Sequence, residues 1–178
     1  MTSTQPTTVI SDAMRAAVGS EMARMVSFPV AESDIRRWAI AVYYPEIPPA
    51  RFWDAEAAAA RRWGGIVAPE DFNPFAWMAA EPKGRKSGAA AAASNPDNTE
   101  NQMGIEGPGL KNPLNGGLSV QYFEPMRPGD VITAVTRLGE YSERTGSLGL
   151  MLFTPYESTW TNQRDELVKK SRMTLIRY

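Results

Sequence analysis

The chain has 178 residues, 43% of them hydrophobic, and a formal net charge of -1 from 19 lysines and arginines against 20 aspartates and glutamates. This balance gives no electrostatic basis for binding nucleic acid or an anionic membrane surface. No apolar run approaches the roughly 18 residues of a membrane span. The length predicts one domain with its own core, and the N-terminus lacks the pattern of a signal peptide, so we expect a cytoplasmic protein.

Two residue types are missing, because the chain has neither cysteine nor histidine. Without cysteine there is no disulfide, thiolate nucleophile or cysteine-based metal site. Without histidine, Ser-His-Asp and Cys-His catalysis are excluded. Acid-base chemistry would have to use Asp, Glu, Lys or Tyr. A metal site made of carboxylates alone is open but unsupported, and no cofactor is predicted.

The first part of the chain reads as a short lead followed by a strand and a helix. Residues 1–18 are predicted to be a disordered or short helical lead, and residues 24–30 a strand. An amphipathic helix follows, because apolar residues recur at helical spacing: Ile35, Trp38, Ala39 and Val42. Residues 43–51 are rich in proline and form a connector that cannot be helical.

Residues 54–63 predict a helix with unusually small side chains. Asp54 and Glu56 place acid in the first turn, and arginines stand in the last, which suits the helix dipole. Gly64 and Gly65 end it. Because Ala57 to Ala60 leave no bulk on any face, we expect a sheet to supply that bulk by curling over the helix. An ordinary alanine-rich surface helix is the alternative.

The next segment is predicted to be a short helix and then a long loop. Glu70 and Asp71 are expected to cap a helix that reaches about residue 78. Residues 79–113 show little periodicity and many Gly, Pro, Asn and Ser residues, which is typical of a functional lid or a disordered segment.

From Leu114 onward the pattern changes to long strands with short turns. Strands are predicted over residues 119–125, 131–143, 146–160 and 167–178, with turns at Arg127 to Asp130 and Asn162 to Glu166. Strands that follow the helices, instead of alternating with them, predict the α+β class with an antiparallel meander.

The motifs SDIRRWAIAV, RRWGGIVAP, LNGGLSVQYFEPMRPGD and TNQRDELVKKSRMTLIRY occur in an order that resembles MaoC-like acyl dehydratases. The chain resembles in particular their N-terminal domain, the FAS1-like dehydratase domain. The resemblance implies that residues 19–178 form a single hot-dog fold. In that fold a long antiparallel sheet wraps around a central helix, here residues 54–63, and two hot dogs pair side by side.

The resemblance also implies addition or removal of water across the 2,3 double bond of an acyl thioester on coenzyme A (acyl-CoA) or on acyl carrier protein (acyl-ACP). Catalytic members use an Asp and a His, whose positions fall near Ile47 and Phe52 here. Asn115 stands where the family often has another histidine, before Gly116 and Gly117. The chain therefore resembles a noncatalytic, substrate-accommodating subunit of an enoyl-thioester hydratase, inactive alone. Its partner would be a second MaoC-like hot-dog subunit that carries Asp and His.

The candidate substrate-binding residues each have an ordinary structural explanation as well. Phe52 and Trp53 either line an acyl pocket or fill the core. Asn115, Gly116 and Gly117 either let the backbone approach a thioester closely or simply form a turn.

Two alternatives to the heteromeric hydratase stay open. A free-standing hot-dog thioesterase would use Asp71 or Glu70 as its base, since a buried carboxylate with a raised pKa can replace histidine. A non-enzymatic acyl-thioester-binding module is the other. The acyl chain, whether steroid, fatty or short and branched, is not determined by the sequence.

Overall fold

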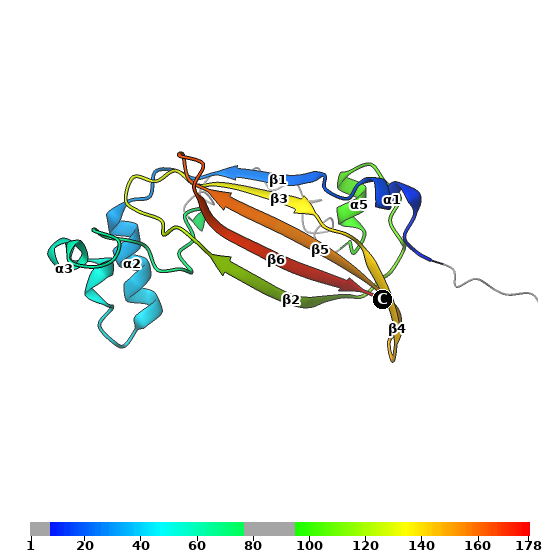
Figure 1. Cartoon of the computed structure of the whole chain (residues 1–178). Coiled ribbons are helices and arrows are strands. Elements are labelled where there is room, and N and C mark those ends of the chain that lie inside the picture. The colour runs from blue at the N-terminus through cyan, green and yellow to red at the C-terminus, as the bar shows by residue number, and fades with distance from the viewer. Residues whose placement is uncertain (1–7, 77–94) are drawn as a thin grey trace, which may run out of the picture.

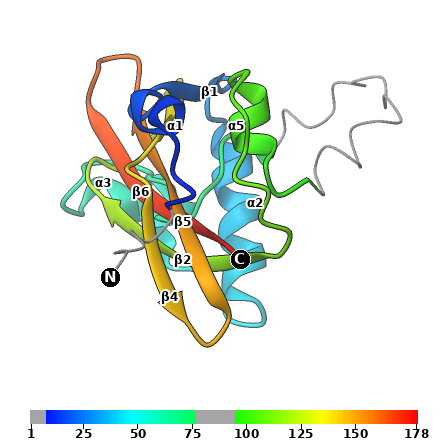
Figure 2. The same cartoon turned by 90° about the vertical axis from the view of Figure 1, so that its right-hand side faces the viewer.

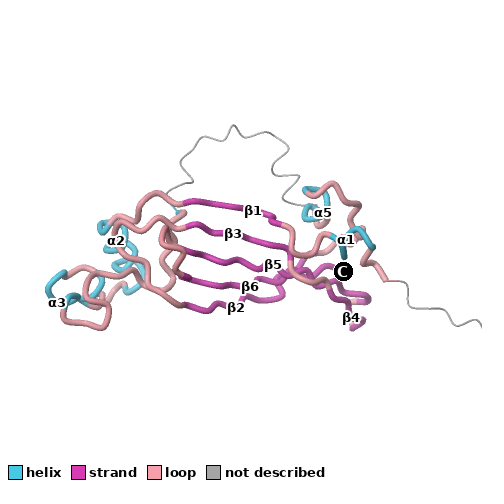
Figure 3. Tube along the Cα trace, turned by 45° about the horizontal axis from the view of Figure 1, so that its top comes forward, coloured by secondary structure: helices cyan, strands magenta, loops and turns pink. Residues whose placement is uncertain are grey.

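The structure, a computed structural model, describes residues 8–76 and 95–178. Its centre is one antiparallel sheet with the strand order β1-β3-β5-β6-β2, and β4 pairs with the beginning of β5. Figure 3 shows the five long strands side by side in this order. The strands are β1 (Glu21–Val26), β2 (Pro113–Tyr122), β3 (Thr133–Leu138), β4 (Ser142–Gly146), β5 (Gly149–Thr161) and β6 (Leu167–Arg177).

The helices lie at the two ends of the sheet (Figure 1). We call one the pocket end, with α2 (Glu32–Tyr43), the 3-10 turn η1 (Ala50–Phe52) and α3 (Ala55–Ala59). The other is the α5 end, with α1 (Asp12–Ala16) and α5 (Asn98–Gln102). Figure 2 shows α2 and α5 on the same side of the sheet. None of the described helices is long and apolar enough to cross a membrane.

The predicted α+β class is confirmed, and β3, β5 and β6 form the predicted antiparallel meander. The pairing of the remaining strands was not predictable from local sequence. β2 pairs with β6 and not with the next strand along the chain, while β1 pairs with β3. The strand predicted to start at Gly146 begins as a hairpin, because residues 142–146 fold back on residues 149–153.

The predicted central helix over residues 54–63 needs a correction. Asp54 does cap the helix, since its side chain accepts a hydrogen bond from the Ala57 amide at 3.0 Å. The helix nevertheless ends at Ala59, and it lies beyond the strand ends and against η1, not beneath the sheet (Figure 1). Methyl side chains are too short to fill the face of a sheet, and only Ala58 is buried within this helix.

Aromatic and branched side chains form the core at the pocket end instead. Ile35 and Ala39 of α2 are fully buried, as the helical spacing predicted, whereas Val42 is exposed. Trp38 packs edge-on against Phe72 with 5.7 Å between ring centroids, a favoured aromatic geometry.

β2 contains a bulge near its beginning. Asn115 pairs with Leu175 and Leu118 pairs with Met173, so three steps along β2 match two along β6. A Cβ at Gly116 would lie 2.8 Å from Cγ1 of Ile176, and Gly117 has a φ of +110°. Both positions therefore require glycine, one for close strand approach and one for its backbone angle.

A buried ion pair orders the α5 end. The Arg177 guanidinium donates to both carboxylate oxygens of Glu100 at 2.7 Å, and both side chains are 0% exposed. Tyr141 donates to Glu100 at 2.7 Å, and Arg177 also donates to Thr154 at 2.9 Å. Burial alone would raise the pKa of Glu100, but the hydrogen bonds from Arg177 and Tyr141 outweigh it and hold that pKa below its ordinary value.

This ion pair involves the second half of the predicted loop 79–113. α5 lies there, so that part is tied to β6 and not loose; residues 79–94 of the prediction lie outside the described residues. In the lead, α1 is the predicted short helix, and its Met14 is 1% exposed.

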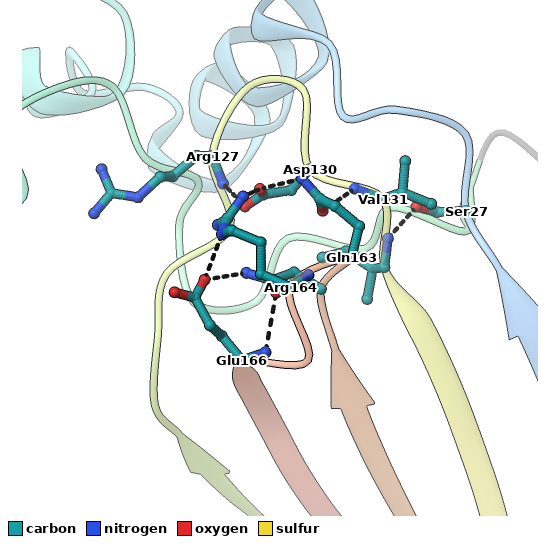
Figure 4. A network of polar contacts seen from close by, with 9 residues as sticks. Ser27, Arg127, Asp130, Val131, Gln163, Arg164 and Glu166 are labelled. Atoms are coloured by element: carbon teal, nitrogen blue, oxygen red, sulfur yellow. Dashed lines mark hydrogen bonds and ion pairs between the residues drawn. The ribbon is translucent and has the colours of Figure 1, made fainter.

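A polar cluster around Asp130 joins the turns at the pocket end (Figure 4). The Asp130 carboxylate, 2% exposed, accepts hydrogen bonds from the Arg127 amide at 2.8 Å and from the Arg164 guanidinium at 3.1 Å. The predicted turn is confirmed by the bond from the Asp130 amide to the Arg127 carbonyl at 3.0 Å. The Arg127 side chain also donates to the carbonyl of Trp63 at 2.7 Å.

Candidate functional site

A cavity of about 760 Å³ lies at the pocket end. Its walls come from the end of α2 with η1, from residues 61–63, from residues 67–71, and from the chain around the end of β2 and the start of β6. The apolar lining includes Tyr43, Phe52, Trp63, Val67, Met126 and Val168. The cavity is of the size and character typical of small-molecule sites.

Phe52 lines this cavity and is also core, because only 3% of it is exposed. Its ring lies 5.9 Å from that of Tyr43, and the Arg51 guanidinium stacks 4.4 Å from its centroid. Phe52 is therefore both a core residue and a lining residue of the cavity. Trp53 differs: it is 37% exposed, donates to the Pro48 carbonyl at 2.9 Å and is not among the lining residues. Ile47 is 84% exposed.

Glu70 and Asp71 both line the cavity, and the predicted helix does not begin at them. They lie in a turn, and the Asn73 side chain that follows accepts a hydrogen bond from the Phe75 amide at 3.0 Å. The last residues of the predicted helix, 77 and 78, lie outside the described residues. Asp71 instead accepts a hydrogen bond from the Tyr122 hydroxyl at 2.5 Å.

Tyr122 and Lys169 are direct neighbours on β2 and β6, and both line the cavity. The Lys169 Nζ lies 3.4 Å from the ring centroid of Trp160, the next residue in the same row. Burial, together with the hydrogen bond to Asp71, raises the pKa of Tyr122 to about 12. Burial lowers the pKa of Lys169, while the charge of Asp71 acts in the opposite direction. At neutral pH the phenol therefore stays protonated, beside an acceptor carboxylate and an amine.

Three arginines add positive charge to the lining: Arg51, Arg61 and Arg62. Arg62 stacks on Trp63 with 4.4 Å to the ring centroid. Guanidinium groups suit phosphate and carboxylate ligands. Within residues 8–76 and 95–178, no three acidic side chains are grouped to hold a metal ion.

Asn115, Gly116 and Gly117 do not join Phe52 at the cavity. They lie at the start of β2, near the α5 end, whereas Tyr122 ends the same strand at the cavity (Figure 1). Asn115 accepts a hydrogen bond from the Gly117 amide at 2.8 Å, which stabilises the bulge. The structure thus separates the two groups of predicted binding residues.

Tyr122 and Lys169 were not predicted as site residues. Both lie in stretches predicted only as strands. What brings them together is the register between β2 and β6, which depends on the bulge and has no local sequence signal.

A family model described as "FAS1-like, dehydratase domain region" matches residues 16–171. No curated protein matches the chain in sequence.

Solved structures of similar fold include the MaoC-like dehydratase from Rhodospirillum rubrum, with a TM-score of 0.52 and 20% identity over 91% of this chain and 92% of that one. A chain of the ChsH1-ChsH2 complex from Mycobacterium tuberculosis matches with a TM-score of 0.60 and 18% identity over 92% and 86%. The HadBC (3R-hydroxyacyl-ACP dehydratase) complex from the same organism matches with a TM-score of 0.52 and 20% identity over 89% and 99%. The predicted hot-dog fold is thereby confirmed.

Proposed function

The chain belongs to the family of FAS1-like dehydratase domain regions, and from this we propose that it is the noncatalytic subunit of a heteromeric enoyl-thioester hydratase or 3-hydroxyacyl-thioester dehydratase. The observation that carries the proposal is Phe52. At the position where resembled catalytic members present histidine, this chain has a ring that is 3% exposed and lines a cavity. The chain contains no histidine anywhere.

The cavity supports a role in accommodating substrate. Its apolar walls suit an acyl chain, and a volume of about 760 Å³ falls within the usual range for ligand pockets. Phe52 adds apolar surface to the cavity. A catalytic histidine at this position would add an acid-base group instead. The acyl group would be held here, and the partner subunit would supply the Asp and His that move protons and water. A cytoplasmic location is part of the same proposal.

Among the described residues, β2 is an edge strand, and this supports a partner subunit at that side. β2 is the last strand of the sheet and leaves large apolar side chains exposed, with Leu118 at 64% and Leu114 at 43%. An exposed apolar edge strand can pair with a strand of another chain through its unpaired backbone groups, unless another element covers it. The solved ChsH1-ChsH2 and HadBC assemblies are complexes of two differently named components, which is consistent with a heteromer here.

The decisive experiment compares the chain alone with the chain co-expressed with a MaoC-like protein that carries Asp and His. Hydration of an enoyl-CoA should be absent for the isolated chain and present for the complex. The matched control is the same complex with the partner's catalytic Asp changed to Asn, and this complex should show no hydratase activity. Hydratase activity of the isolated chain would contradict the proposal.

The site of assembly can be tested at the two sheet edges. Leu118→Glu places a charge on the β2 edge and should weaken assembly with the partner, since it would bury an unpaired carboxylate. Met25→Glu is the matched control on the opposite edge, where Met25 is 46% exposed. Size-exclusion chromatography of each mixture measures the complex. Equal loss for both variants would remove the β2 edge as the assembly surface.

A second candidate, a free-standing thioesterase, is favoured by the contact between Asp71 and Tyr122 at the cavity wall. In this reaction Asp71 takes a proton from water as the water oxygen attacks the thioester carbonyl, the C–S bond breaks, and Asp71 returns the proton to the leaving thiolate. Release of free thiol from an acyl-CoA should then disappear in Asp71→Asn and persist in Glu70→Gln. Tight acyl-CoA binding without a partner and without hydrolysis would instead favour a binding module.

A further inference from the structure

Lys169 occupies an unusual place for a lysine. It lines the cavity, whereas the next residue, Lys170, is exposed and projects from the opposite face of β6. The row that contains Lys169 runs from Trp160 on β5 to Tyr122 on β2. Its amine is therefore stacked on an aromatic ring, in a residue that lines the cavity.

A contact with Trp160 restrains the position of the amine. Its Nζ lies 3.4 Å from the Trp160 centroid, and Trp160 is in turn fixed by an edge-on contact with Phe75 at 5.0 Å. The carboxylate of Asp71 is engaged by the Tyr122 hydroxyl at 2.5 Å. Lys169 forms no ion pair with the carboxylates of the described residues.

Burial makes this amine easier to deprotonate than that of a solvated lysine. It lowers the pKa of Lys169, and the opposing charge of Asp71 does not cancel the effect. The neutral form of an amine is the nucleophile. A restrained amine with a lowered pKa, on a residue that lines an acyl-binding cavity, can thus meet an electrophilic carbonyl that binds there.

We propose that Lys169 is a self-acylation site, modified by an acyl thioester bound in the cavity. The nitrogen lone pair attacks the thioester carbonyl carbon, a C–N bond forms and the C–S bond breaks. The thiolate leaves and takes up the proton released by the nitrogen, which gives the free thiol. The product is an amide, and no oxidant, metal or cofactor takes part. The inference rests on the proposed function, because it requires an acyl thioester to occupy this cavity.

The modification would change the site that produces it. It removes the positive charge stacked on Trp160 and attaches an acyl chain to the wall, so that a second acyl chain meets a filled cavity. Acylated protein should therefore lose affinity for further thioester.

The test is incubation of the full chain with octanoyl-CoA, followed by peptide mass spectrometry. Binding raises the local concentration of the thioester, so we expect labelling of Lys169 to exceed that of Lys170 and Lys111 by about ten-fold or more. The rate should saturate as octanoyl-CoA increases. A parallel reaction with octanoyl acyl carrier protein distinguishes the two carriers. Lys169→Arg keeps the charge over Trp160 but removes the acceptor, and it should lose most of the adduct.

Binding of octanoyl-CoA to the natural chain and to Lys169→Arg is measured by tryptophan fluorescence. This measurement separates failure of the acylation from failure of thioester binding. Binding without preferential labelling of Lys169 in the natural chain overturns the acylation and leaves the hydratase proposal standing. Equal labelling of Lys169 and Lys170, or a rate that rises linearly with thioester, also overturns it. Absence of binding to the chain overturns the acylation, and the hydration assay on the complex then decides the proposed function separately.

Discussion

The charged residues of the α5 end differ from those that line the cavity in how their charges are compensated. At the α5 end, Arg177 and Glu100 are fully buried and bonded to each other. At the pocket end, Lys169 and Asp71 line a cavity, and the Lys169 amine rests on a ring instead of on a carboxylate. Burial of a charge is tolerated only where a partner compensates for it. The first pair therefore serves structure, and the second set is available to a ligand.

The largest expected effect is the loss of the buried pair. Arg177→Met leaves the Glu100 carboxylate buried without its counter-charge, so the free energy of unfolding should fall by about 3–5 kcal/mol. Urea unfolding followed by circular dichroism measures it.

Arg172→Met is the matched control on the same strand. Its ion pair with Glu157 spans 3.6 Å, and both side chains are 54% exposed. Pairs of this kind contribute about 0–1 kcal/mol. Similar losses for both variants would contradict the contrast between the two ends.

A smaller effect is expected on acidification. Because the pKa of Glu100 is lower in the folded chain than its ordinary value of 4.5, its contribution to stability is present above that value. The contribution is lost as the pH falls through the folded pKa. The Glu100→Gln variant lacks this contribution to stability even at neutral pH.

The difference in urea midpoint between the natural chain and Glu100→Gln should therefore shrink between about pH 5 and acid values below the folded pKa. A difference that stays constant over this range would show that the carboxylate charge is not what stabilises the α5 end.

The smallest expected effect on stability lies at the cavity. Asp71→Asn removes the charge that accepts the Tyr122 proton, so the pKa of Tyr122 should fall from about 12 but stay above its ordinary value of 10.0, since burial remains. Stability should change by only about 1 kcal/mol. NMR titration of labelled tyrosine measures the pKa, and Glu70→Gln, which keeps the hydrogen bond, should give a smaller shift.

The elements that could be predicted from the sequence are those with a local period. α2 follows from apolar residues at helical spacing, and β3, β5 and β6 from alternation between turns. The helix at residues 54–63 failed as a central helix, because propensity predicts that a helix forms but not where it packs. Phe52 was placed at the cavity by family resemblance.

The parts that could not be predicted depend on distant residues. Arg177 and Glu100 are 77 positions apart, and each alone reads as a surface charge. Asp71 and Tyr122 are 51 positions apart, and helix capping accounted for Asp71 equally well in the sequence. Only the fold distinguishes these cases.

The bulge in β2 determines which side chain reaches the cavity. Continuing the pairing of Asn115 with Leu175 without the extra residue would place Gln121, and not Tyr122, opposite Lys169. The phenol would then project from the reverse face, and Asp71 would lose its donor. Gly116 and Gly117, at the far end of β2, thus determine which face of the sheet each later side chain of this strand occupies. Deleting one glycine would exchange the side chains of the two faces without changing the chemistry of any cavity residue.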